Sequence, residues 1–226
     1  MRDHIRKFIR GKQAFSKEEH SGYQLHYHKI QDVWNGDKQD DYGLLRIFRL
    51  FIVCSLFLFP GVLIDEIFKS KSYITKKLIV ELYVFLKTVF PILVLLNSWY
   101  HHQFIYYLGI YLLIETYLYL FSKIFLEYQH LKVSNMRTLL LLVFNFFESG
   151  LTFAVIYIAG NYLNIPLKDA VDAIYFSFVT SATIGYGDIH PINETGKLIV
   201  TTQIFSSISF LVLFFNFFSG RAHEVE

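Results

Sequence analysis

The chain has 226 residues, of which 54% are hydrophobic, 19% aromatic and 18% charged. Soluble domains average about 45–50% apolar and about 25% charged residues, so this composition argues against a soluble domain. The charged residues are also unevenly placed, with 15 in residues 1–43 and seven in residues 138–219. We therefore predict a polar N-terminal tail over residues 1–43, followed by an all-α polytopic membrane protein.

The tail shows no defined binding site. Its basic start is not followed by a long apolar stretch, so we do not expect a cleaved signal peptide. The net charge of the chain is only +2 and no Lys/Arg run is dense, which excludes a nucleic-acid footprint. His20, His26 and His28 match no metal-site spacing, so we expect a solvated histidine cluster.

The next segment, Leu50–Ile64, is ambiguous. It has 15 residues and is interrupted by Pro60-Gly61. We expect it to lie in the membrane interface or to enter the bilayer partway, and the alternative is that, extended back to Leu44, it spans the bilayer. Cys54 lies in this apolar run and is the one cysteine of the chain, which excludes a disulfide framework. We expect Cys54 to be a buried packing residue.

Four later segments have the 17–25 mostly apolar residues that a bilayer core requires. They are Leu78–Leu96, Phe104–Phe121, Thr138–Gly160 and Leu198–Phe218. The first contains Glu81 and Lys87, which are six residues apart and therefore do not share a helical face. The second contains Glu115, which is either a regulatory or proton-sensing group or one that faces the helix bundle or snorkels to the interface, and we favour the latter pair.

A shorter helix is predicted at about Leu167–Ser181. Pro166 precedes it, and Asp169 and Asp172 in its first turns suit the positive end of a helix dipole. The helix is too short to span and lies between two full spans. Irregular backbone at membrane depth is tolerated only where protein buries it or where it lines a water-filled path, so this pattern indicates a re-entrant pore loop.

Residues 183–188 read Thr-Ile-Gly-Tyr-Gly-Asp. Here the sequence resembles the tetrameric potassium channels, whose filter is a TVGYG segment. The resemblance covers residues 138–219 and implies a pore domain of outer helix, pore helix, filter and inner helix. Residues 44–137 would supply two or three further membrane helices and an interfacial linker, and residues 220–226 a short cytoplasmic C-terminus.

The resemblance also implies a mechanism. A dehydrated K⁺ ion needs oxygens in place of its water, and backbone carbonyls supply them where successive carbonyls point at one axis. That geometry requires left-handed backbone at alternate residues, which glycine adopts without steric cost. The implied K⁺ ligands are the carbonyls of Thr183, Ile184, Gly185 and Tyr186 and the Thr183 hydroxyl, with Gly187 and Asp188 completing the filter. One chain supplies a quarter of each ion site, so a homotetramer is implied.

Several positions depart from the family pattern. The aromatic pair on the pore helix is Tyr175-Phe176 in place of two tryptophans, and with Thr180 these residues are expected to support the filter. Val179 stands where some bacterial members have an acidic residue, so Asp188 is expected to lack that partner.

The inner helix has its own departure. Ser207 stands where many relatives have a hinge glycine. Ser207, Phe210 and Phe214 are candidate hinge or gate residues, and packing is the alternative for the phenylalanines.

The topology follows from the filter, whose Gly187–Asp188 end would face outside. The C-terminus and the Lys/Arg-bearing segments 65–77 and 122–137 are then cytoplasmic, and the loop 97–103, without Lys or Arg, is outside. We expect a cytoplasmic tail, a place in the cell membrane and an interfacial helix over residues 123–137. No helix repeats arginine every third residue, so an arginine-based voltage sensor is not expected.

The leading hypothesis is therefore a potassium-selective channel that conducts passively through a homotetramer in a lipid bilayer. The first alternative is a weakly selective cation channel. The second is a membrane-embedded enzyme or sensor using Glu115, His101, His102 and the tail histidines, but no nucleophile–base pair or metal triad shares a face. We predict no enzyme activity, no cofactor other than the permeant K⁺, no nucleic-acid partner and no small-molecule ligand domain.

Overall fold

The computed structural model describes residues 22–35, 43–56, 60, 66–67, 73–126 and 136–222. Within these residues the chain is helical, and an isolated bridge between Leu163 and Pro191 is the one extended pairing. The chain divides into two compact units, residues 1–83 and 84–226.

The first unit contains α2 (Gly22–Asn35) and α3 (Leu44–Ser55), followed by the start of α5. The Arg46 guanidinium donates a hydrogen bond to the Trp34 carbonyl and links α3 to α2. The expectation for Cys54 was wrong, because this thiol is exposed. The buried positions of α3 are Arg49, Ile52, Val53 and Ser55, so an apolar run alone did not identify the buried face.

The ambiguous segment Leu50–Ile64 is only partly described. The helix α3 ends at Ser55, and most of residues 57–65 lie outside the described residues. The predicted interfacial helix at 123–137 has a similar outcome. Its first three residues continue the preceding membrane helix, and residues 127–135 lie outside the described part.

Four helices in the described residues are long and apolar enough to cross a membrane, as predicted. They are α5 (Tyr73–Leu96), α6 (Gln103–Phe125), α7 (Met136–Ala159) and α9 (Glu194–Ala222), with the short η2 (Trp99–His101) between α5 and α6. The helices extend a few residues beyond the predicted apolar segments, because backbone hydrogen bonding continues into polar residues such as Gln103 and Glu194. The protein is a multi-pass membrane protein.

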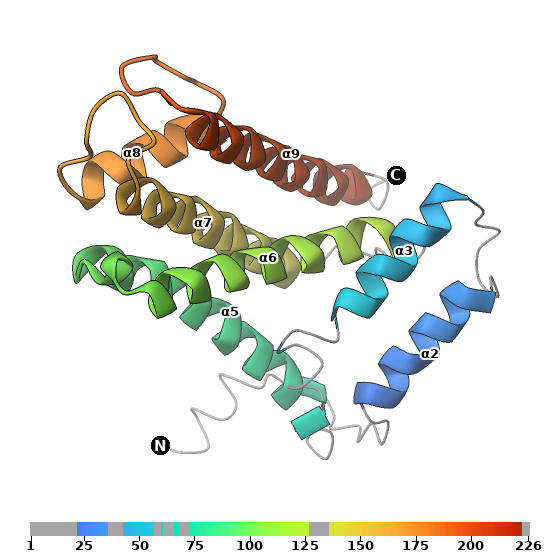
Figure 1. The fold of residues 1–226 in the computed structure, drawn as a ribbon. Coiled ribbons are helices and arrows are strands. Elements are labelled where there is room, and N and C mark those ends of the chain that lie inside the picture. Colours follow the sequence, from blue (N-terminus) through green and yellow to red (C-terminus); the bar gives the residue numbers. More distant parts are fainter. Residues whose placement is uncertain are drawn as a thin grey trace, which may run out of the picture. The chain divides into compact units, whose positions relative to one another are not determined.

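The helix α7 is the centre of the second unit. Of its most apolar stretch 61% is buried inside the chain, against 28% in α6 and in α9. The helices α6, α7 and α9 run side by side, and the short α8 (Ala170–Ser181) lies at one end of α7, between two loops (Figure 1). The end of α5 packs on the same helix, with Val94 and Leu95 against Leu151, Ala154 and Val155.

A glycine sets the distance between α7 and α8. A Cβ at Gly150 would lie 2.8 Å from Cζ of Phe178, which is closer than side chains tolerate. The Ser177 hydroxyl donates a hydrogen bond of 2.6 Å to the Gly150 carbonyl at the same crossing. The short helix is therefore held tightly against the central helix, and this contact positions everything that follows α8.

Candidate functional site

The start of α8 is fixed by Asp169. Its carboxylate accepts hydrogen bonds from the backbone amides of Val171 (2.9 Å) and Asp172 (3.0 Å), which makes it the N-cap. The Asp172 carboxylate accepts in turn from the Lys168 amide at 3.2 Å. The helix therefore begins at Ala170 and not at Leu167 as predicted, because the backbone of Asp169 is extended. Asp169 therefore lies at the positive end of the helix dipole, as expected, and in addition caps the helix.

The end of α8 is a Schellman motif that leads into the Gly-Tyr-Gly segment. The Ile184 amide donates to the Val179 carbonyl and the Thr183 amide donates to the Thr180 carbonyl, each at 3.0 Å. The residue after the cap in this motif has left-handed backbone and is usually glycine. Here it is Thr183, with φ +56°. Left-handed backbone costs about 1–2 kcal/mol at a residue with a side chain, so the surrounding structure must hold Thr183 in place.

Left-handed backbone recurs at every second residue of this segment. Gly185 has φ +56° and Gly187 has φ +84°, whereas Ile184 and Tyr186 are not in the positive-φ region. A Cβ at either glycine would meet no atom within 4 Å of its own chain. Backbone conformation, and not lack of space within the chain, is therefore what requires glycine at 185 and 187.

The residues after Gly187 are hydrogen-bonded to the loop that follows α7. The Asn164 side chain donates to the Asp188 carbonyl at 3.1 Å and accepts from the His190 amide at 2.8 Å. The Ile192 amide donates to the Tyr162 carbonyl at 3.0 Å. The segment 183–187 thus has fixed attachments at both ends, α8 before it and the loop after α7 behind it.

Tyr175 braces the segment from the side. Its hydroxyl donates to the Asp188 carboxylate at 2.9 Å, and its ring lies parallel to that of Tyr186, with 6.4 Å between centroids. Position 179 is a valine and gives Asp188 no acidic partner, as expected, and the hydrogen-bond donor to Asp188 is instead Tyr175. The hydrogen bond to Asp188 is the main cause that raises the pKa of Tyr175 above its usual range.

The other two predicted support residues on α8 are buried. The Phe176 ring packs edge-on against Tyr157 of α7, with 4.7 Å between centroids. Thr180 is also buried, and its carbonyl accepts the Schellman bond from Thr183. By contrast, Ile184 and Tyr186 are 54% and 66% exposed in the single chain. The segment is therefore held from one side and open on the other.

Comparison with known proteins agrees with this arrangement. Residues 139–223 match a family model described as an ion channel. A hyperpolarization-activated voltage-gated potassium channel of Methanocaldococcus jannaschii is 36% identical over 58 residues, 26% of this chain and 28% of the relative. The voltage-gated potassium channel Kch of Escherichia coli K12 is 34% identical over 58 residues, 26% of this chain and 14% of the relative.

A third relative is the two pore potassium channel a of Oryza sativa subsp. japonica, 43% identical over 44 residues, which are 20% of this chain and 13% of the relative. Residues 139–223 are therefore similar to ion channels, and these three relatives are potassium channels. The chain spans 13–28% of the length of these three relatives. No solved structure matches it. The matched region, here called the pore-loop domain, contains most of α7 and all of α8 and α9, and its similarity to ion channels argues against the enzyme alternative.

In the last helix of the pore-loop domain, the three candidate hinge or gate residues face the other helices. Ser207 is buried and its hydroxyl bonds the Gln203 carbonyl one turn earlier, at 3.0 Å. Phe210 is 1% exposed and packs edge-on against Tyr117 of α6 and Phe146 of α7. Phe214 contacts Phe146 as well. These positions correspond to the packing alternative for the two phenylalanines.

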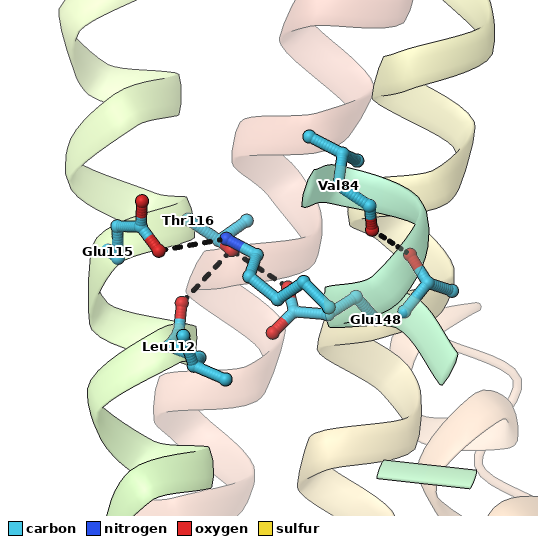
Figure 2. Close-up of polar contacts among 7 residues, drawn as sticks. Val84, Leu112, Glu115, Thr116 and Glu148 are labelled. Atoms are coloured by element: carbon cyan, nitrogen blue, oxygen red, sulfur yellow. Dashed lines mark hydrogen bonds and ion pairs between the residues drawn. The ribbon is translucent and has the colours of Figure 1, made fainter. Parts of the chain in front are cut away.

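A buried charged cluster joins α5 and α6 to α7 of the pore-loop domain (Figure 2). Lys87 Nζ lies 3.3 Å from Glu115 Oε2, and both side chains are under 10% exposed. The hydroxyl of Thr116, beside Glu115 on α6, donates to Glu148 of α7 at 2.8 Å. The bundle-facing interpretation of Glu115 is confirmed, and Lys87 pairs with Glu115 across two helices.

Two buried polar residues of the domain, Glu148 and Gln203, were not among the predicted site residues. Their position inside predicted membrane spans could have identified them, because a polar side chain within a span is often functional. The histidines of the enzyme alternative form no site. His101 and His102 are exposed, and no group of three metal-binding side chains occurs among the described residues. The tail residue His20 and the side chain of His26 lie outside the described part.

Proposed function

We propose that the protein is a potassium-selective channel that conducts K⁺ passively through a filter formed by residues 183–188. The observation that carries the proposal is the left-handed backbone at Thr183, Gly185 and Gly187, directly after α8. Alternation of this kind turns successive carbonyls to one side, where they replace the water around a K⁺ ion. The ion ligands are then the carbonyls of Thr183, Ile184, Gly185 and Tyr186, together with the Thr183 hydroxyl.

The proposed active unit is a homotetramer. In each chain the carbonyls of the filter segment point to one side of the segment. They can surround an ion only when several copies of the chain are arranged around a common axis. The exposure of Ile184 and Tyr186 in the single chain supports this, because large apolar and aromatic side chains at membrane depth pack against protein or lipid. The exposed apolar residues along α9, among them Leu198, Phe205 and Leu211, would contact neighbouring copies or lipid.

Electrostatics supports cation conduction at both ends of the filter. The C-terminus of α8 directs the negative end of its dipole toward the start of the filter. The segment 161–196 carries one Lys and four Asp/Glu, net −3 per chain. Four copies would surround the mouth with acidic residues and raise the local cation concentration.

The proposed topology follows the positive-inside distribution of Lys and Arg. In this proposal residues 1–43 form a polar tail and residues 44–137 the additional membrane helices and linker. Residues 138–219 form the pore domain, and residues 220–226 end in the cytoplasm beneath the cell membrane. Ser207 is the proposed site of inner-helix bending, because a hydroxyl bonded to the carbonyl one turn earlier often bends a helix.

Purified protein in liposomes provides the test. We expect K⁺ flux that Ba²⁺ blocks, and a reversal potential under K⁺/Na⁺ bi-ionic conditions that shows preference for K⁺. A potential near zero would favour the weakly selective alternative. Gly185→Ser should abolish flux without preventing membrane insertion, because serine tolerates the left-handed backbone poorly.

Gly109→Ala is the matched control, because a Cβ there lies 3.8 Å from its nearest neighbours in an ordinary helix. We expect its flux to equal that of the wild type. Flux that survives Gly185→Ser, or assembled protein that conducts no K⁺ at any voltage or pH, would contradict the proposed function.

A further inference from the structure

We propose that Gln203 is a positioning residue for the filter: its side-chain amide ties the last turns of α8 to α7 and α9 and thereby sets ion selectivity. The inference rests on the proposed function, because it concerns how the filter is held. It adds a residue outside the filter motif and the pore helix.

Gln203 is an amide in the middle of an apolar membrane helix, and it is only 1% exposed. Burial of an amide is unfavourable unless its donors and acceptor are all bonded. Its Oε1 accepts a hydrogen bond of 2.6 Å from the hydroxyl of Tyr157 on α7. Its Nε2 has two hydrogens, which it shares among three oxygens of α8, namely the Ser177 carbonyl (2.8 Å), the Ser177 hydroxyl (2.9 Å) and the Ser181 hydroxyl (2.7 Å).

These contacts connect three helices in one buried network. The Ser177 hydroxyl accepts from Gln203 and donates to the Gly150 carbonyl of α7 at 2.6 Å. Tyr157, Ser177 and Ser181 are themselves less than 10% exposed. A fully bonded network in a water-excluded site fixes one arrangement of its helices, because any shift leaves buried donors or acceptors without partners.

The network holds the part of α8 from which the filter starts. Ser181 is the last residue of α8, and Thr183, two residues later, has the left-handed backbone that begins the filter. A conformation of that kind persists only where its surroundings determine it. Gln203 bonds to both serines of the last two turns and so provides such a restraint from the inner helix. We therefore expect that any change in the position of α9 near Gln203 is transmitted to Thr183.

Three variants test the assignment. Gln203→Met keeps the approximate size of the side chain and removes every hydrogen bond. Gln203→Glu keeps an acceptor for Tyr157 and removes the donors to α8. Tyr157→Phe removes the bond to Oε1 and leaves the donors in place. Thr201→Val, two residues away on α9, is the matched control, because the Thr201 hydroxyl bonds the Lys197 carbonyl within its own helix.

The measurement is the Na⁺/K⁺ permeability ratio from bi-ionic reversal potentials, recorded together with oligomeric state and thermal unfolding midpoint. We expect Gln203→Met and Gln203→Glu to raise the ratio on the order of tenfold, the factor that corresponds to about one net hydrogen bond. Tyr157→Phe should raise it less, and Thr201→Val should leave it unchanged.

The outcomes separate this inference from the proposed function. In one outcome the wild type conducts K⁺ selectively, and Gln203→Met has the wild-type permeability ratio and only a lower unfolding midpoint. This outcome would leave the channel proposal intact and overturn the role of Gln203. A wild type without K⁺ selectivity would overturn both. If the Gln203 variants fail to assemble, Ser181→Ala provides the test, because it removes one acceptor for Gln203 at the end of α8. An unchanged permeability ratio in Ser181→Ala would then contradict the inference.

Discussion

The phenol of Tyr175 on α8 donates a hydrogen bond to the carboxylate of Asp188, with 2.9 Å between the two oxygens. The same ring lies parallel to that of Tyr186. One side chain therefore contacts the Gly-Tyr-Gly segment at two points, beside it and just after it. The contact to Asp188 requires the protonated phenol, because a carboxylate only accepts hydrogen bonds.

We expect Tyr175 to ionise above its ordinary pKa of 10.0. The hydrogen bond to Asp188 raises the folded-state pKa, so its contribution to stability is complete below the ordinary value. That contribution is lost as the pH rises through the folded-state pKa. The difference in phenolate absorbance between the wild type and Tyr175→Phe during an alkaline titration measures this midpoint. A midpoint at or below the ordinary value would contradict the contact, and Asp188→Asn should move the midpoint downward.

We expect Thr183→Gly to stabilise the chain and impair the channel. Glycine relieves the left-handed backbone at φ +56°, which is worth about 1 kcal/mol, so the thermal unfolding midpoint should rise. Loss of the hydroxyl removes a proposed K⁺ ligand, so K⁺ conductance should fall. Thr183→Ser is the control, because it keeps both the hydroxyl and the strain. A midpoint for Thr183→Gly at or below that of the wild type would show that Thr183 is not strained.

We expect Lys87→Met to destabilise the bundle by about 3–5 kcal/mol, because it leaves the buried Glu115 carboxylate without the cation 3.3 Å away. The double variant Lys87→Met/Glu115→Gln should recover part of this loss, since it also removes the charge of Glu115, whereas the buried carboxylate of Glu148 in the same cluster remains. Unfolding in detergent with increasing denaturant gives the free energies for the cycle. Additive single-variant effects would mean that the two side chains do not interact.

We expect Gly150→Ala to separate α7 from α8, at a cost of about 1–3 kcal/mol, because the new methyl group would lie 2.8 Å from the Phe178 ring. The additional variant Phe178→Leu should restore part of the stability by making room. Gly109→Ala, where the new methyl lies 3.8 Å from its neighbours, should have no comparable effect. Equal unfolding midpoints for the two alanine variants would contradict the close contact between α7 and α8.

Local chemistry in the sequence was enough to predict much of this protein. The four membrane spans follow from the length of the apolar segments, since a helix needs about 20 mostly apolar residues to cross a bilayer. The short helix with an acidic first turn and the glycines at 185 and 187 are likewise local signals, because caps and left-handed backbone depend on residues near in the chain. Helix limits were less accurate, as the start at Ala170 shows.

The tertiary structure alone decided which side chains meet. Lys87 and Glu115 are 28 residues apart and Tyr157 and Gln203 are 46 apart. No spacing rule predicts such pairs, because helix periodicity describes the faces of one helix and not the neighbour that each face contacts. The same reason explains Cys54, which is exposed although its run is apolar, and Asp188, whose partner is a tyrosine on another element. The sequence by itself determined where the helices form and which filter positions need glycine. The packing of the helices against one another decided which buried polar side chains contact each other.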